Sequence, residues 1–462
     1  MFAESVYKER REGLRRRMGS GLLLFPGNNE SPMNYRANTY PFRQDSSFLY
    51  YFGVDSPGFV GLIDVDEDRD YLYGNDFDLD DIIWMGPQPL VRKLAARVGI
   101  EATGSLGQLA DRLNAAVNAG RRVHFLPPYR VDERERIAEW LGLGMAAVAR
   151  HASRALVQAV VAQRSEKSDA EVSEIEKALD ISARMYETVM SLTRPGINEG
   201  EVAGALLGVV GRVNSCTSFP TILSVHGETL HNHYHGNRMS NGDLLVVDSG
   251  AESPEHYASD ITRTFPVGGR FTPLQGQVYE IVLRAQETAI QAMCPGIRFL
   301  DVHLAAAREI AVGLKEMGLM KGDPDEAVQV GAHALFFPHG LGHMLGLDVH
   351  DMENLGEDLV GYDETVSRSR QFGLSALRMA RELRPGFVLT VEPGIYFIPA
   401  LIDQWQREDT HGDFINYEAI EAFRKFGGIR IEDDVLVTKD GHRVLGPGIP
   451  KAVADIESGM KG

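Results

Sequence analysis

The sequence predicts a smaller α/β domain over residues 1–165, followed by a larger α+β domain over residues 166–462. With 462 residues, the chain is longer than one ordinary hydrophobic core supports. Its first third alternates short apolar strands with helical patterns, which is typical of an α/β domain. The pattern breaks at the polar stretch QRSEKSDA, and long helices and a strand-rich final third follow. Two domains of different class are therefore expected.

Local patterns predict the elements of the first domain. Residues 5–18 have a basic amphipathic pattern typical of a helix, and GLLLFPG at residues 21–27 indicates a buried strand closed by a Pro-Gly turn. Residues 40–66 carry two apolar and aromatic runs broken by DSPG, so we expect a strand, a turn and a strand there. The acidic run at residues 64–81 indicates a solvated loop or the edge of a hairpin. Two helices and one strand are expected within residues 90–127.

The second domain is expected to begin with a long helix. Ser168 stands at the N-cap position of SDAEVSEIEKALDISARMYETVMSL, acidic residues fill the first turn, and a Pro-Gly pair ends the pattern. A second helix is expected at residues 196–214, then two strands, GDLLVVDSGAE and HYASDITRTFPV, and two helices at residues 274–293 and 301–318. The last third favours a pair of strand segments, RPGFVLTVEPGIYF and GGIRIEDDVLVT.

Composition excludes several classes of function. The chain has 65 acidic and 47 basic residues, and its formal net charge of −18 repels phosphate backbones, so nucleic acid is not an expected partner. No apolar run reaches the length of a membrane span or forms a signal-peptide core. Only Cys216 and Cys294 are present, which favours a reducing compartment. We expect a cytoplasmic protein with no membrane partner.

One short segment concentrates histidines. Residues 336–350, FFPHGLGHMLGLDVH, place His339, His343 and His350 among glycines and large apolar residues. Histidine binds divalent metals well and titrates near neutral pH, so this segment is a candidate site. Two core histidines and one surface histidine would explain the segment alone equally well. It is not an HExxH zinc motif, because the glutamate is absent and two glycines disfavour a helix.

Four carboxylates lie within apolar runs that are predicted to be strands. They are Asp248 in LLVVDSG, Asp260 in YASDITRTF, Glu392 in VLTVEPG and Glu432 in GIRIEDDVLV. A buried carboxylate must be paired, protonated or bound to a metal, because burying an isolated charge costs several kcal/mol. Four of them, together with a histidine segment, are better explained by a metal site than by separate salt bridges. Such a set suits two divalent cations, and oxygen-rich ligation favours manganese, iron, cobalt or zinc.

Five signatures then occur in the order typical of one family: VVDSG, SDITRTFP, HGLGHMLGLDVHD, VEPGIYF and RIEDDV. The chain resembles the pita-bread metallopeptidases, in particular the proline-directed branch that contains prolidase (Xaa-Pro dipeptidase) and aminopeptidase P. The resemblance covers nearly the whole chain, from FRQDSSFLYYFG through GIRIEDDVLVT. It implies a pita-bread fold for the second domain and two divalent metal ions, with Mn²⁺ expected. It also implies that Asp260 and Glu432 bridge the two metal ions. The five implied ligands are Asp248, Asp260, His343, Glu392 and Glu432.

The same resemblance assigns roles to further residues. Glu392 would also carry the proton, and His231 in LHNHYH and His350 in DVHD would stabilise the tetrahedral intermediate. His339 would help to hold the substrate. Arg430, two residues before a ligand, resembles a site arginine that orients ligands or Tyr396. Two alternatives stay open: His231 as a turn histidine on a wet loop, and Arg430 as a surface salt-bridge partner.

The choice of branch depends on Arg378. Proline has no backbone N–H, so a dedicated site must recognise its ring by shape. Prolidase accepts only dipeptides, partly through an arginine that meets the free carboxylate, and GLSALRMARELRPG places Arg378 where that arginine is expected. We therefore expect an Xaa-Pro dipeptidase, with a Xaa-Pro aminopeptidase acting on longer peptides as the alternative. A solvent-facing helix arginine is the other interpretation of Arg378. The preceding segment, residues 352–373, departs from both branches in length and charge.

Two further expectations concern partners. Trp84 in IWMG is similarly placed to a tryptophan that reaches the neighbouring subunit's site in relatives, which implies a homodimer or higher homo-oligomer and a substrate contact. A buried core tryptophan is the alternative. Some pita-bread proteins are non-catalytic binding modules, but those typically lack metal ligands, whereas all five positions are filled here.

Overall fold

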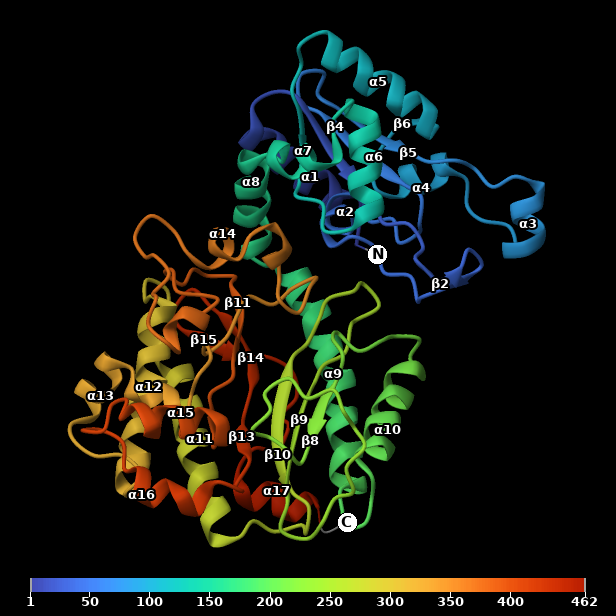
Figure 1. Cartoon of the computed structure of the whole chain (residues 1–462). Helices are drawn as coiled ribbons and strands as arrows, with labels where there is room; N and C mark the ends of the chain where they lie inside the picture. Colours follow the sequence, from blue (N-terminus) through green and yellow to red (C-terminus); the bar gives the residue numbers. More distant parts are fainter. Residues whose placement is uncertain (1, 461–462) are drawn as a thin grey trace. The chain divides into compact units, whose positions relative to one another are not determined.

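The computed structural model describes residues 2–460, and the chain in it forms two compact units (Figure 1). The boundary between the N-terminal and C-terminal units lies between Arg164 and Ser165. The short segment Asn354–Leu359 belongs to the N-terminal unit, although the residues on both sides of it belong to the C-terminal unit. Within the described residues, none of the helices combines the length and apolar character needed to cross a bilayer.

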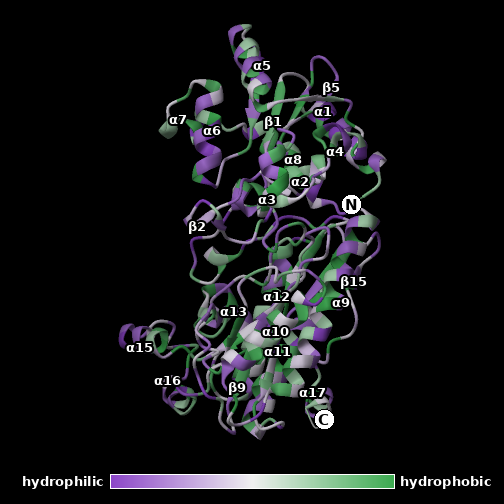
Figure 2. Ribbon diagram, turned by 90° about the vertical axis from the view of Figure 1, so that its right-hand side faces the viewer, coloured by the Kyte–Doolittle hydropathy of each residue, from purple (hydrophilic) through white to green (hydrophobic). Residues whose placement is uncertain are grey.

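The N-terminal unit is built on a mixed five-stranded sheet, as an α/β domain requires. In sheet order, the strands are β6 (Ala102–Gly104), β5 (Arg69–Tyr73), β4 (Val60–Asp64), β1 (Leu22–Pro26) and β7 (Val123–Phe125). β1 pairs with β4 antiparallel and with β7 parallel, and β5 pairs with β4 antiparallel and with β6 parallel. The helices of this unit include α1 (Glu4–Met18), α4 (Val91–Arg97), α5 (Leu106–Asn118), α6 (Val131–Leu141), α7 (Met145–His151) and α8 (Arg154–Ser165). Green, hydrophobic residues follow the strands in Figure 2, whereas α6 is largely purple and hydrophilic.

One expectation for this unit is wrong. The aromatic run SSFLYYF forms a helix, α2 (Ser46–Phe52), where a strand was expected before the DSPG turn. Asp45 caps this helix, because its carboxylate accepts a hydrogen bond from the Phe48 N–H at 2.8 Å. Gly53, at φ +57°, ends it in the left-handed conformation that glycine tolerates best. The acidic stretch that follows β5 contains a short helix, α3 (Leu79–Met85), and a small hairpin pairs β2 (Pro32–Tyr35) with β3 (Asn38–Thr39).

The C-terminal unit combines long helices with antiparallel sheets, which confirms its predicted α+β class. Ser168 caps α9 as predicted, with Glu171 completing the capping box. The helices are α9 (Asp169–Leu192), α10 (Glu199–Gly211), α11 (Pro273–Ala292), α12 (Phe299–Glu316), α13 (Pro324–Val330), α15 (Pro399–Glu408), α16 (Tyr417–Ile420) and α17 (Val453–Gly459), while α14 (Glu357–Gly361) spans a unit boundary.

Three small antiparallel sheets make up the strand-rich part of this unit. The first has the order β10 (Ile261–Pro266), β9 (Leu244–Ser249), β8 (Ile222–Ser224). The second is β11 (Val388–Val391), β14 (Asp433–Val437), β15 (His442–Val444), and the third pairs β12 (Gly394–Tyr396) with β13 (Gly428–Arg430). Single bridges join Thr262 on β10 to Glu432, and Met344 of the histidine segment to Leu389 on β11, so Glu432 lies beside β10 and the histidine segment lies beside β11.

Candidate metal centre

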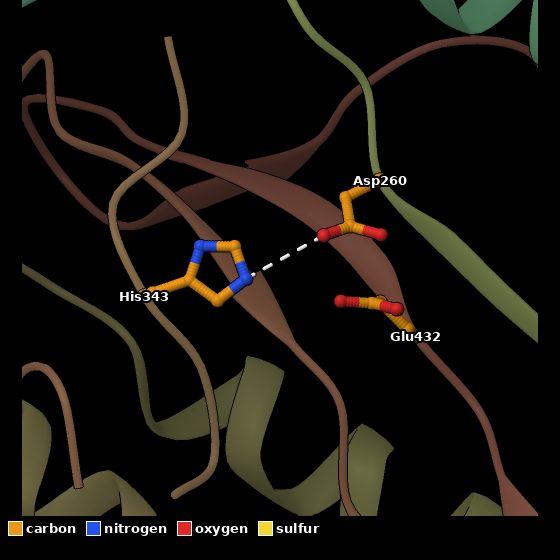
Figure 3. A group of neighbouring side chains, drawn as sticks. All are labelled: Asp260, His343 and Glu432. Atoms are coloured by element: carbon orange, nitrogen blue, oxygen red, sulfur yellow. Dashed lines mark ion pairs between the residues drawn. The ribbon is translucent and has the colours of Figure 1, made fainter. Parts of the chain in front are cut away.

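A cavity of about 530 Å³ lies within the C-terminal unit, and most of the predicted site residues line it. At one place in its wall, ligand atoms of Asp260, His343 and Glu432 all lie within 4.8 Å of one another (Figure 3). All three side chains are buried. The other predicted site residues in the cavity wall are His231, Asp248, His339, His350, Arg378, Glu392 and Arg430.

The backbone places the four carboxylates differently from the expectation. Only Asp248 lies inside a strand, β9; Asp260 directly precedes β10, Glu392 directly follows β11, and Glu432 stands between β13 and β14. The prediction that each lies within a strand is therefore wrong for three of them. Strand pairing still brings them together, because the antiparallel register sets Asp248 opposite Thr262 and the single bridge sets Thr262 opposite Glu432.

Backbone contacts orient the histidine of this group. His343 Nδ1 lies 3.1 Å from the carbonyl oxygen of Met344, and a carbonyl only accepts, so Nδ1 carries the proton. Nε2 then faces the carboxylates, at 3.5 Å from Asp260 and 3.6 Å from Glu392. A fixed tautomer with a free Nε2 is what a metal-ligating histidine needs.

The candidate ligands carry more negative charge than the neighbouring side chains balance. A bound cation would offset that excess. Among the described residues, Asp248 Oδ1 and Asp260 Oδ1 are buried without a hydrogen-bond partner. Burial, together with the neighbouring carboxylates, raises the pKa of Asp260 and of Glu432 well above the ordinary range. Burial also raises the pKa of Glu392 to about 7. Native proteins pair buried carboxylates or bind metal with them, so these oxygen and imidazole donors fit divalent cations.

Arg430 connects this group to the rest of the wall. Its guanidinium donates to Asp248 Oδ2 at 2.7 Å and to the Tyr396 hydroxyl at 2.8 Å, and the whole side chain is buried. It is therefore not a surface salt-bridge residue. His339 Nε2 lies 3.0 Å from the same hydroxyl, while its Nδ1 donates to the Gly340 carbonyl. Burial lowers the pKa of His339 to about 3, so the ring is neutral and accepts the hydroxyl proton.

His350 packs directly against the group. Its ring stacks on His343 with centroids 3.8 Å apart, and its Nδ1 lies 3.0 Å from Glu353 Oε2. The same carboxylate oxygen accepts a hydrogen bond from Arg378 Nη1 at 2.6 Å. Arg378 follows a short 3-10 turn and is not on the face of a helix, contrary to the alternative interpretation. His231 lies on a turn in the wall of the same cavity.

Two predicted site residues do not line this cavity: Tyr396, which is buried beside His339 and Arg430, and Trp84. Trp84 lies on α3 in the N-terminal unit, and its side chain is 79% exposed, so it is not a buried core tryptophan. Conversely, sequence reasoning missed Glu353 and the apolar part of the wall, where Phe219, Pro220 and Leu230 lie. The one feature of the sequence that could have assigned these residues to the site is their proximity to the histidine motifs.

Known proteins resemble the chain over nearly its whole length. The model of metallopeptidase family M24 matches residues 173–439, and the model of the aminopeptidase P N-terminal domain matches residues 7–124. The Xaa-Pro dipeptidase of Homo sapiens is 35% identical over 456 residues, which covers 96% of this chain and 89% of the human protein. A probable Xaa-Pro aminopeptidase of Metarhizium acridum is 31% identical over 458 residues, covering 92% and 87%. The solved structure of aminopeptidase PepP from Pseudomonas aeruginosa aligns with a TM-score of 0.81 at 30% identity, covering 100% of this chain and 98% of that one.

Proposed function

This chain belongs to metallopeptidase family M24, and we propose on that premise that it is an exopeptidase that hydrolyses Xaa-Pro bonds, acting as a dipeptidase. The membership confirms the resemblance inferred from the five motifs. One observation carries the proposal: four carboxylates, an imidazole and a guanidinium from distant parts of the chain share one cavity wall. A non-catalytic binding module would have no use for buried carboxylate oxygens that no described side chain satisfies.

We propose that two divalent cations, manganese in the native protein, are held by Asp248, Asp260, His343, Glu392 and Glu432. When bound, such cations supply the Lewis-acid charge that makes water a nucleophile near neutral pH and polarises a carbonyl. Thr262 fixes one of these carboxylates, because its hydroxyl donates to Glu432 at 2.5 Å. Thr390 contacts Glu392 at 3.4 Å in the same way. Partners of this kind hold ligands in the productive orientation.

The chain's own residues would then handle the substrate. Glu392 takes the proton from the attacking water and returns it to the departing amine. His231 and His350 stabilise the oxygen on which negative charge develops; His350 does so as the protonated ring, because its Nδ1–H is already donated to Glu353. The hydroxyl of Tyr396 is fixed between His339 and Arg430, so His339 is held rigidly where it contacts the peptide.

Recognition of proline and of peptide length would come from other residues of the cavity wall. Phe219, Pro220 and Leu230 offer an apolar surface for the ring, which has no N–H to satisfy. Arg378 would bind the free carboxylate of a dipeptide through a charge-assisted hydrogen bond. The second candidate is a Xaa-Pro aminopeptidase, and one observation favours it: Glu353 already occupies one N–H of Arg378.

We also propose that the protein is a cytoplasmic homodimer or higher homo-oligomer. The helix α3 is short and buries none of its residues, and its apolar side chains are left in solvent. The largest exposed fractions belong to Leu79, Ile83, Trp84 and Met85. A surface helix of this composition supports association with a second copy, where Trp84 would be covered.

The test combines metal content, stability and products. The metal-free protein should gain thermal stability on adding Mn²⁺, by about 3 kcal/mol at a hundredfold excess over the dissociation constant. The manganese-loaded protein should then release proline from Ala-Pro, and Arg378→Ala should raise the KM for this dipeptide. Fast cleavage of Ala-Pro-Ala, with no effect of Arg378→Ala on Ala-Pro, would instead establish the aminopeptidase. Cleavage of neither peptide would refute the proposed activity.

A further inference from the structure

Glu353 lies between two residues of the cavity wall. Its Oε2 accepts from Arg378 Nη1 at 2.6 Å and from His350 Nδ1 at 3.0 Å, and its side chain is only 16% exposed. The contact with His350 is local, since the two residues are three positions apart. The contact with Arg378 joins positions 25 residues apart, so it depends on the tertiary fold and not on local backbone structure.

The backbone before Glu353 is bent to make these contacts. Met352 has φ +66°, a left-handed conformation that is uncommon for a residue other than glycine and unfavourable for a long side chain. Its side chain is fully buried, which anchors the turn. Asp351 is tied on the other side by a buried ion pair with Lys167 at 3.0 Å. The carboxylate of Glu353 is therefore held against Arg378 by fixed neighbours.

A carboxylate in this position changes what Arg378 offers to a peptide. A guanidinium beside an anion attracts a second anion less strongly, and two carboxylates that share one arginine repel each other. The effect is large where side chains are mostly out of water. A guanidinium whose charge is partly cancelled is still a hydrogen-bond donor to uncharged acceptors such as a peptide carbonyl, because hydrogen bonding needs no net charge.

We propose that Glu353 is a specificity-determining positioning residue: it holds Arg378 and cancels part of its charge, so that the preference of the site for a free carboxylate after proline is weaker than Arg378 alone would give. This inference rests on the proposed dipeptidase activity and concerns how strongly that activity selects the free carboxylate of its substrate.

The experiment compares Ala-Pro with Ala-Pro-amide, which differ only in the charge after proline. In the manganese-loaded Glu353→Gln protein, the ratio of kcat/KM for Ala-Pro over the amide should rise about tenfold, mainly through a lower KM for Ala-Pro. Glu353→Asp keeps the charge, so its ratio should stay within about twofold of the wild-type ratio. Any change that acts through His350 affects both substrates and cancels in the ratio.

Two controls separate charge from shape. In an Arg378→Met background, adding Glu353→Gln should leave the ratio unchanged, because the residue acts through the arginine. The exposed Glu364, in the same segment, serves as the matched control: Glu364→Gln should have the wild-type ratio. An unchanged or lower ratio in Glu353→Gln, or an equal rise in Glu353→Asp, would overturn the proposal.

A binding measurement distinguishes this inference from the proposed activity. Calorimetry on the metal-free protein should show tighter binding of Ala-Pro to Glu353→Gln than to the wild type, and no such change for the amide. If the loaded wild type cleaved neither substrate, the activity would be refuted, while the calorimetric comparison would still support or overturn the role of Glu353.

Discussion

Buried carboxylates occur in both units, but the protein treats them in opposite ways. In the N-terminal sheet, Asp64 at the end of β4 is fully buried, and it accepts hydrogen bonds from Arg121 at 3.1 Å and from the Glu67 N–H at 3.1 Å. In the cavity of the C-terminal unit, Asp248 and Asp260 each keep a buried oxygen that no described group satisfies. Burial alone therefore does not identify a functional carboxylate. The functional candidates are the carboxylates that lie beside a cavity and keep an oxygen without a positively charged or hydrogen-bonding partner.

The same contrast exists between sequence neighbours. Asp433 directly follows Glu432, yet its carboxylate is held by Arg263 at 2.7 Å and by Lys451 at 2.7 Å. Although burial opposes ionisation, these two cations lower the pKa of Asp433. Glu432 instead accepts a hydrogen bond from the uncharged Thr262 hydroxyl, and burial, together with neighbouring carboxylates, raises its pKa. Successive residues on an extended chain point to opposite sides, so one carboxylate is structural and the other faces the candidate metal centre.

The largest effect is expected from removing a candidate ligand. Asp260→Asn or Glu432→Gln should lower kcat/KM for Ala-Pro by about a thousandfold or more, because the charge that a divalent cation supplies is worth several kcal/mol. Metal analysis should show a loss of bound manganese in the same variants. Asp64→Asn serves as the matched control for a buried aspartate, and it should retain the wild-type metal content. Equal metal content in all three variants would contradict the distinction between the two regions.

The next effect concerns stability. Asp64→Asn should destabilise the N-terminal unit by about 2 kcal/mol, since it removes the buried anion that Arg121 and Arg112 contact and leaves these arginines only the more exposed Asp66 and Glu67. Hydrogen exchange of the β4 amides would measure it. If the exchange of β4 stayed at the wild-type rate, Asp64 would not be the structural counterpart of the cavity carboxylates.

The smallest effect, taken per pH unit, is a dependence of stability on pH. Burial, reinforced by Asp45, raises the pKa of Glu133 on α6 from 4.5 to about 9. Because the folded pKa exceeds the unfolded one, the unit should lose stability as pH rises from about 5 to 9, by about 1 kcal/mol per pH unit. The other charged groups near Glu133 are Arg136, Asp132 and Arg130. Glu133→Gln should remove this slope, as measured by hydrogen exchange of α6 at several pH values; an identical slope in the variant would refute the assignment.

The sequence predicted the elements whose signals are local. Ser168 with its capping box marked the start of α9, and the alternation of strands and helices identified the α/β class of the first unit. The prediction of a strand at SSFLYYF was wrong. Aromatic residues favour strands by composition, but here the Asp45 cap and Gly53 at the end stabilise a helix. The cavity residues were identifiable because each stands in a short motif. Glu353 was not, because its contact with Arg378 exists only after folding.

The bridge between Thr262 and Glu432 joins positions 170 residues apart in the chain. During synthesis, which runs from the N-terminus, Asp248 and Asp260 emerge long before the last carboxylate. A nascent chain therefore carries an incomplete set of candidate ligands until Glu432 has left the ribosome. A hydrolase built in this order cannot attack peptides, its own unfolded segments included, before that late residue has been added.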